Sequence, residues 1–305
     1  LHILILGFAY RQTYLNTRDL ITKFFYRTTV ISEQWILILA VVGSMIFFVK
    51  EVYLGNINII LIWLALLALK YLIEGKNRRF GMVFTLVILT KPFFGLLILP
   101  LIFRKDIPAM LYILFGIIAG LLIPSVFYGF EKNLILISDW INTMVIHDSS
   151  FPSVNSIDYL THRYFFPNLS AYFEMVILLA FIAAFFLCKW IQVRKIDFSQ
   201  LADTQSLVIE WFIILALIPN LFKMDTEHFL ASIPLITFLV YFIAVNRKYL
   251  LIPLMVVLIF FFGGNSQDLL GKEFSGFLFQ LGLIGISNLL MVLMLLILYI
   301  RKSGS

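Results

Sequence analysis

Long apolar runs separated by short charged stretches make up most of this chain. Such runs predict membrane helices, because a helix crosses a bilayer with about 20 apolar residues and lipid cannot satisfy an open backbone. The pattern gives the end of one helix at 1–10 and spans near 34–49, 57–73, 108–129, 171–188, 206–222, 229–245, 249–263 and 276–300. We therefore expect an all-α, polytopic transmembrane helix bundle of about eight to ten membrane segments, forming one integral-membrane domain over residues 1–305.

The run from Phe80 to Phe103 contains a single charge, Lys91, which is followed by Pro92. It is long enough for one span, but the Lys-Pro pair divides it into two halves that could form a helical hairpin turning inside the membrane. Lysine and arginine favour the cytoplasmic loops of a membrane protein. With a hairpin most of the basic residues gather on one side, whereas a single span would divide them. The sequence therefore predicts a hairpin with Lys91 at its tip, in the extracytoplasmic half of the membrane.

Composition excludes a soluble globule, because 62% of the residues are apolar, 13% are charged and the mean hydropathy is +1.00. The chain has one cysteine, Cys188, so it can form neither an intramolecular disulfide nor a cysteine-based metal cluster. The basic turns are short and contain no glycine motif for phosphate, which argues against a cytoplasmic nucleotide-sugar donor. Their cations are spread over many turns, so we expect no nucleic-acid partner.

Lys91 is the leading candidate for a functional residue. A charge inside lipid costs about 3 kcal/mol or more, so it needs a partner or a watery cavity. The alternative is a structural cation bonded to the carbonyls that Pro92 leaves without a donor. Acidic and histidine residues lie on the predicted outer side, as does the long stretch 131–170, which carries several aromatic residues. We expect this stretch to be an extracytoplasmic loop that packs at the membrane interface and covers a cavity.

Two segments carry a resemblance to a known family. Residues 54–61 resemble a Gly-Gln-x-Asn motif that precedes a leucine-rich helix, with Asn56 in place of the glutamine and Asn58 as the asparagine. Lys91-Pro92 and the basic pair at 104–105 resemble a Lys-Pro helix closed by a basic cluster. These are motifs of glycosyltransferase family 87, the polyprenol-phosphate-mannose-dependent mannosyltransferases with the multi-helix membrane fold called GT-C.

Two further segments are similar to the same family. Residues 154–157 resemble its Asn-Gln-Ser-Leu motif, although Asp158 stands where an arginine is common. Pro219, followed by His228 and Pro234, resembles its Ser-Pro and His-Tyr pattern, with Glu227 where a second histidine is frequent. The order and spacing of the motifs hold over residues 50–240.

The resemblance implies transfer of a sugar, mannose in the first instance, from a polyprenyl-phosphate donor to a glycan or lipid acceptor at the extracytoplasmic face of the cell membrane. It implies that Lys91 contacts the lipid phosphate, that Asn56 and Asn58 orient sugar or phosphate oxygens, and that His228 contributes from a facing helix end. Asn155 and Ser156 join these substrate-binding candidates. The expected partners are the lipid-linked donor, the acceptor and membrane lipids, with no metal or cofactor.

The catalytic carboxylate is not identified by this comparison. In the GT-C fold that the resemblance implies, it is normally an aspartate of the first outer loop, which would precede Leu1. We therefore expect the chain to lack its N-terminal part and to have little activity by itself. Asp158 and Asp225 are candidate substitutes, but nothing in their spacing singles them out.

Each site candidate has a structural alternative. Asn56 and Asn58 could cap a helix, His228 could be an interfacial histidine, and Asn155 with Ser156 could form an ordinary turn. A metal site at 225–228 is disfavoured, since all its ligands would come from one short loop.

Two other functions use lipid-linked sugars or anions. A transporter or flippase also binds anions at a broken helix, but an internal repeat of the Lys-Pro break is not found in the second half of the sequence. A glycan polymerase or ligase would be expected to use arginines of a large outer loop, where this chain has Arg163 alone. The sugar, the acceptor and the oligomeric state are not encoded in any of these patterns.

Overall fold

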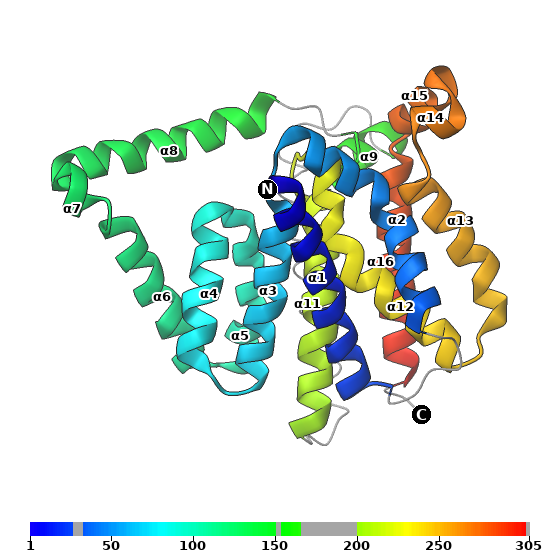
Figure 1. The fold of residues 1–305 in the computed structure, drawn as a ribbon, viewed down its shortest axis with the longest axis horizontal. Coiled ribbons are helices and arrows are strands. Elements are labelled where there is room, and N and C mark those ends of the chain that lie inside the picture. The colour runs from blue at the N-terminus through cyan, green and yellow to red at the C-terminus, as the bar shows by residue number, and fades with distance from the viewer. Residues whose placement is uncertain (27–32, 151–153, 166–199, 303–305) are drawn as a thin grey trace.

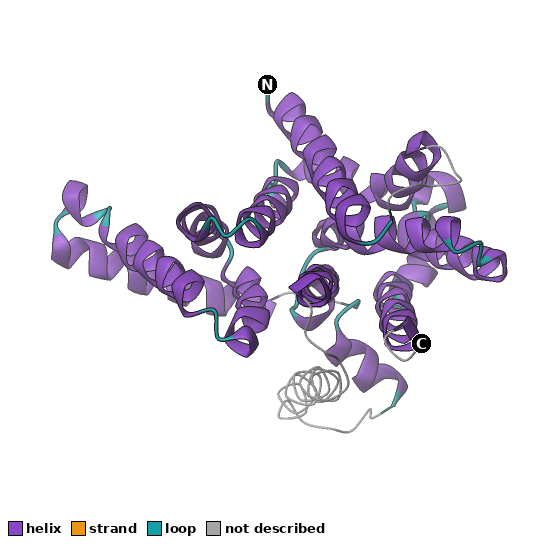
Figure 2. Ribbon diagram, turned by 90° about the horizontal axis from the view of Figure 1, so that it is seen from below, coloured by secondary structure: helices purple, strands orange, loops and turns teal. Residues whose placement is uncertain are grey.

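The computed structural model describes residues 1–26, 33–150, 154–165 and 200–302. Within these ranges the chain consists of helices and their connections, with no strand (Figures 1 and 2). The all-α prediction is confirmed. Its physical basis is the apolar composition, because lipid offers no hydrogen-bond partners and a helix pairs its backbone N–H and C=O groups within a single segment. The predicted span at 171–188 lies outside the described residues.

The described residues up to 165 form, in order, α1 (His2–Phe24), α2 (Glu33–Leu54), α3 (Asn58–Ile73), α4 (Asn77–Thr90), the 3₁₀ helix η1 (Pro92–Ile98), α5 (Leu99–Arg104), α6 (Ile107–Leu122), α7 (Ser125–Tyr128), α8 (Phe130–Ser150) and α9 (Ile157–Tyr164). The second part contains α11 (Gln200–Leu221), η2 (Thr226–Ser232), α12 (Ile233–Val245), η3 (Tyr249–Leu251), α13 (Ile252–Gly263), α14 (Gln267–Leu270), α15 (Lys272–Gln280) and α16 (Leu283–Lys302).

Four helices in the described ranges are long and apolar enough to cross a membrane, at Gln34–Leu54, Ile107–Tyr128, Asp203–Leu221 and Thr226–Val245. The bent pair α15 and α16 is a possible fifth span, and α3, η1 with α5, and η3 with α13 are shorter apolar helices. The protein is therefore a polytopic membrane bundle. The expected number of eight to ten segments stays a prediction.

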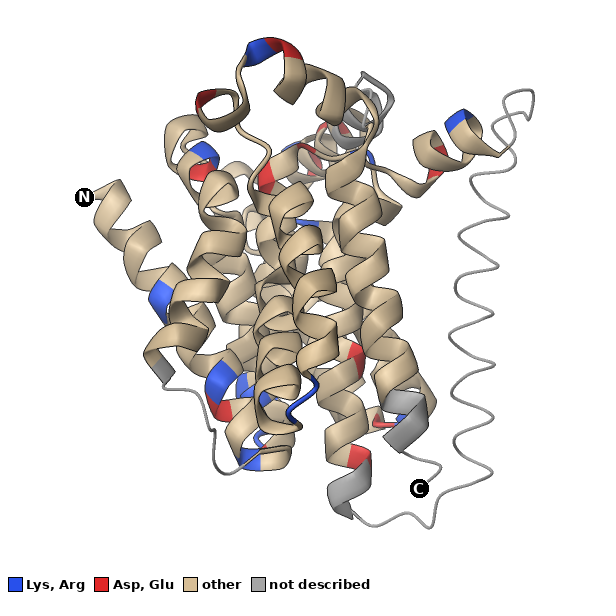
Figure 3. Ribbon diagram, turned by 90° about the vertical axis from the view of Figure 1, so that its right-hand side faces the viewer, with Lys and Arg blue, Asp and Glu red and all other residues tan. Residues whose placement is uncertain are grey.

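The hairpin with Lys91 at its tip is confirmed, whereas its side of the membrane stays a prediction. Helix α4 ends at Thr90, and η1 begins at Pro92 and continues into α5. In Figure 1 the α3–α4 turn and the α5–α6 turn lie at the same, lower end of the bundle, whereas α8, α9, α14 and α15 lie at the upper end. The basic turns at 76–79, 104–105 and 247–248 belong to the lower end, where Figure 3 shows much of the positive charge. We expect this end to face the cytoplasm.

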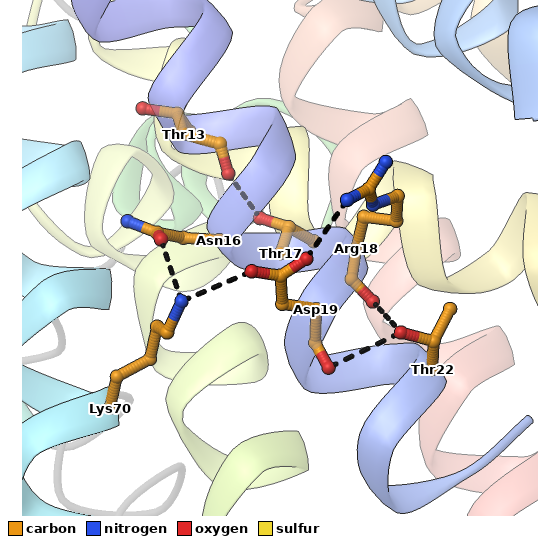
Figure 4. Close-up of polar contacts among 7 residues, drawn as sticks. All are labelled: Thr13, Asn16, Thr17, Arg18, Asp19, Thr22 and Lys70. Carbon is orange, nitrogen blue, oxygen red and sulfur yellow. Dashed lines mark hydrogen bonds and ion pairs between the residues drawn. The ribbon is translucent and has the colours of Figure 1, made fainter.

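Helix α1 is longer than predicted, since it continues from residue 10 to Phe24. The sequence pattern ended it before its first charge, Arg11, but several polar residues further along the helix have hydrogen-bond or ion-pair partners. Thr13 and Thr17 donate to carbonyls four residues earlier at 2.9 and 2.8 Å. Lys70 of α3 donates to Asn16 and forms an ion pair with Asp19, both at 3.1 Å (Figure 4). Polar side chains paired in this way can continue a helix within a membrane protein.

Two other boundaries differ from the prediction. The stretch 131–170 contains helices α8 and α9, and α8 extends sideways from the bundle at its upper end (Figure 1). The span predicted at 276–300 is broken between α15 and α16, which meet at 54°. The break lies at Gly282, whose φ of +68° favours glycine, and a Cβ there would lie 2.4 Å from the carbonyl oxygen of Val154. Apolar periodicity does not reveal either feature.

Helices α4 and α6 approach each other closely through small residues, as is common between membrane helices. An ideal Cβ on Gly116 would lie 2.2 Å from Thr85 Oγ1 and 2.9 Å from Thr85 Cβ. Gly120 and Gly81 are equally close to Leu89 and Tyr112 across the same pair of helices. These contacts hold α4, the first arm of the hairpin, against α6.

We expect Gly116→Ala to lower the stability of the protein by about 1–3 kcal/mol, because a Cβ at this contact forces the two helices apart. Alanine is the better helix former by about 1 kcal/mol, so propensity alone predicts the opposite sign. Gly7→Ala is the control, since α1 leaves the space around Gly7 open within 4 Å. The measurement is the thermal melting midpoint in detergent, and a Gly116→Ala protein as stable as wild type would contradict the packing argument.

Candidate functional site

The candidate site begins at the break between α4 and η1. Lys91 has an extended backbone, with φ −142° and ψ 98°, which is the conformation favoured before a proline. Pro92 has no N–H and cannot continue α4, so it starts the 3₁₀ helix instead. This break directs the half-buried Lys91 side chain toward the ends of α3 and η2.

Two neutral groups accept hydrogen bonds from the Lys91 ammonium. The distances from Nζ are 2.6 Å to Asn58 Oδ1 and 2.9 Å to His228 Nε2. The other ring nitrogen of His228, Nδ1, lies 3.2 Å from the backbone oxygen of Asp225. A carbonyl can only accept, so Nδ1 carries the proton and Nε2 is the acceptor for Lys91.

A buried carboxylate lies behind Asn58. Glu51, in the last turn of α2, is 0% exposed and accepts from Asn58 Nδ2 at 2.8 Å and from the backbone N–H of Ile59 at 3.0 Å. The Ile59 N–H belongs to the first turn of α3, where helix N–H groups lack internal partners and favour a negative charge. Glu51 therefore caps α3 and supplies a counter-charge close to Lys91.

A second group of polar side chains joins the ends of α2 and η2. Asn56 Nδ2 donates to Glu227 Oε1 at 2.8 Å, and Lys50 Nζ donates to Thr226 at 2.7 Å and lies 3.6 Å from Glu227 Oε2. Glu227 is 1% exposed. These contacts attach η2, and with it His228, to the α2–α3 connection.

Lys91, Asp225 and His228 line a cavity of about 960 Å³. Its wall continues along η1 and α5, and α8 closes one side with Trp140 and Thr143. The apolar part of the lining consists of Pro92, Phe93, Leu96, Ile98, Leu99, Ile102, Phe222 and Met224, together with Trp140. Lys223 also lines the cavity, which therefore combines cationic groups with a long apolar wall.

The structure brings together most of the predicted site residues. Lys91, Asn58 and His228 are in direct contact, and Asn56 binds the residue next to His228. Neither Asn56 nor Asn58 is the N-cap of α3, which is Ile57.

The other predicted residues lie elsewhere or play another part. Asn155 is 2% exposed, and its Oδ1 accepts from the backbone N–H of Gly285 at 3.0 Å. Ser156 is the N-cap of α9 and accepts from the N–H of Tyr159 at 3.2 Å. Asp158 is in the first turn of α9 and does not line the cavity.

Sequence reasoning did not select Glu51 or Glu227 as members of the site. One signal could have found them: a cation inside lipid needs a carboxylate, and these two acids border apolar helices on the same side as Lys91. Across the described ranges no three His, Cys, Asp or Glu side chains are placed to hold a metal ion.

Comparison with known proteins gives one match. The family model of glycosyltransferase family 87 matches residues 4–218. This range includes Lys50, Glu51, Asn58 and Lys91, and it ends before η2. No curated protein and no solved structure matches the chain.

Proposed function

The chain belongs to glycosyltransferase family 87 and is a membrane glycosyltransferase, and we propose that it transfers mannose from a polyprenyl-phosphate donor to a glycan or glycolipid. The reaction takes place at the extracytoplasmic face of the cell membrane, the side opposite the basic turns. Neither a metal nor a cofactor is part of the proposal.

One observation carries the donor class, namely an ammonium group in an apolar cavity. A polyprenyl phosphate is an anionic head on a long apolar chain, and it matches Lys91 and the wall formed by η1 and α5. An anion that develops negative charge on leaving is stabilised most by a cation already fixed at that position. We therefore assign Lys91 to the phosphate of the lipid donor, with His228 beside it.

The reaction needs a base as well as a cation. The acceptor hydroxyl oxygen forms a bond to the anomeric carbon, the bond from that carbon to the phosphate oxygen breaks, and the lipid phosphate leaves with the electron pair. The hydroxyl proton passes to a carboxylate. Among the residues that line the cavity, Asp225 is the acidic one, so we propose it for this role in the described part of the chain.

The remaining site predictions receive supporting roles. Asn56 is partly exposed and is proposed to orient the donor, while Asn58 is 1% exposed and acts from behind Lys91. We assign Asn155 and Ser156 to the attachment of α9 to the bundle, because Asn155 accepts a hydrogen bond from Gly285 and Ser156 accepts one from Tyr159.

Donor preference tests this proposal. Purified full-length protein in proteoliposomes is given acceptor glycolipid with labelled mannose either on a polyprenyl phosphate or on a nucleoside diphosphate. We expect label transfer from the lipid donor only, at least 100 times faster than from the nucleotide. Transfer from the nucleotide donor would overturn the donor assignment. Movement of the intact lipid-linked sugar between leaflets, without transfer, would replace the enzyme by a transporter.

A further inference from the structure

The buried carboxylate of Glu51 has no part in the chemistry described so far. It is 0% exposed, and both of its oxygens are bonded inside the protein. It cannot act as a base without leaving this position. Its position two hydrogen bonds away from Lys91 points to an indirect role.

We infer that Glu51 is a positioning residue, which acts through Asn58 to hold the Lys91 ammonium in the cavity with one N–H donor directed to a bound phosphate. This inference rests on the proposed function, because it concerns the same phosphate. It adds a residue and a device, a relay that runs from Glu51 through Asn58 to Lys91.

The direction of each hydrogen bond in the relay is fixed by Glu51. An ionised carboxylate can only accept, so the Asn58 amide must turn Nδ2 toward Glu51 at 2.8 Å. Its oxygen, Oδ1, is then left to face Lys91 Nζ at 2.6 Å. The same carboxylate is itself held by the N–H of Ile59 at 3.0 Å. Every group in the relay therefore has one orientation.

The interposed amide matters for the charge of Lys91. A carboxylate in direct contact with Lys91 would form an ion pair and compete with an incoming phosphate. With Asn58 between them, Glu51 still offsets the charge that is buried, while the ammonium keeps its affinity for an anion. Of the three N–H donors of Lys91, one goes to Asn58 and one to His228, which leaves a third for the ligand.

Reversal of the relay provides the test. In Glu51→Gln the new amide accepts from Ile59 and presents its NH₂ group to Asn58, whose amide must turn and present its own NH₂ group to Lys91. In Asn58→Asp two carboxylates face each other with no proton between them. In the double variant the introduced glutamine donates to the introduced aspartate, which accepts from Lys91. Each hydrogen bond then again joins one donor to one acceptor, with the bond between residues 51 and 58 reversed, and the net charge of wild type is restored.

Steady-state transfer by the full-length protein is measured for the four proteins, together with thermal melting midpoints. We expect each single variant to raise the KM for the lipid donor at least 10-fold. The double variant should recover part of this loss but keep a KM above that of wild type, because its aspartate pairs directly with Lys91 and competes with the phosphate. Glu273→Gln, an exposed acid on α15, is the control and should stay within 2-fold. A merely structural role would lower the melting midpoints but leave the KM of the folded enzyme unchanged.

Two results overturn the inference. The first is a double variant whose KM rises by the product of the two single-variant increases. The second is a Glu51→Gln enzyme with a wild-type KM. Wild-type protein that transfers no sugar would instead refute the proposed function. The relay would then be judged on the melting midpoints, where recovery in the double variant supports it and additive losses refute it.

Discussion

Lys91→Ala is expected to lower sugar transfer by about 100- to 1000-fold, the range seen when one fixed donor to a developing negative charge is removed. Lys91 lines the cavity and is held there by hydrogen bonds of 2.6 Å to Asn58 and 2.9 Å to His228. The measurement is label transfer from polyprenyl-phosphate-mannose by full-length protein in membranes, at matched expression.

The control for this variant is Lys132→Ala, which removes an exposed cation from α8 at the same end of the bundle. Lys132 does not line the cavity, so its loss should change transfer less than 2-fold. Lys91→Arg keeps the charge but cannot fit the same two acceptors, and an intermediate loss is expected. An alanine variant within 10-fold of wild type would show that the phosphate is stabilised elsewhere.

The hairpin and the place of Lys91 at its break could be predicted from sequence because both leave a local signal. The sequence itself shows a charge and a proline within an apolar run. A hairpin also places most Lys and Arg residues on one side of the membrane, whereas a single span divides them, so the hairpin is favoured. The resemblance assigned Asn58 and Lys91 to the same substrate site but did not predict their hydrogen bond. The two residues lie in segments that come together only in the fold, and spacing along the chain does not reveal their contact.

The features that sequence missed share one physical cause, which is tertiary pairing of polar groups. Glu51 and Glu227 look like ordinary acids at the ends of apolar helices until the fold surrounds them with Asn58, Asn56 and Lys50. The continuation of α1 depends in the same way on Lys70. A hydrophobicity pattern treats such residues as boundaries, whereas the bundle contains them.

The largest effect on stability is expected at Arg104, which connects α5, in the second arm of the hairpin, to α11. Its guanidinium donates to Glu210 Oε2 at 2.6 Å and to Asp203 Oδ1 at 2.9 Å. The side chains of Arg104 and Glu210 are 12% and 6% exposed. Arg104→Met leaves the Glu210 carboxylate buried without its cation, and we expect a loss of about 3–5 kcal/mol in the free energy of unfolding.

Two comparisons isolate the cause of that loss. Lys76→Met breaks the Lys76–Glu74 pair, which is also 2.6 Å long but has side chains 48% and 35% exposed, and it should cost less than about 1 kcal/mol. Arg104→Met combined with Glu210→Gln removes the uncompensated charge and should recover most of the stability. Equilibrium unfolding in mixed micelles measures all of these variants. Equal losses for Arg104→Met and Lys76→Met would mean that burial does not set the strength of the pair, and that α5 is held to α11 by apolar packing instead.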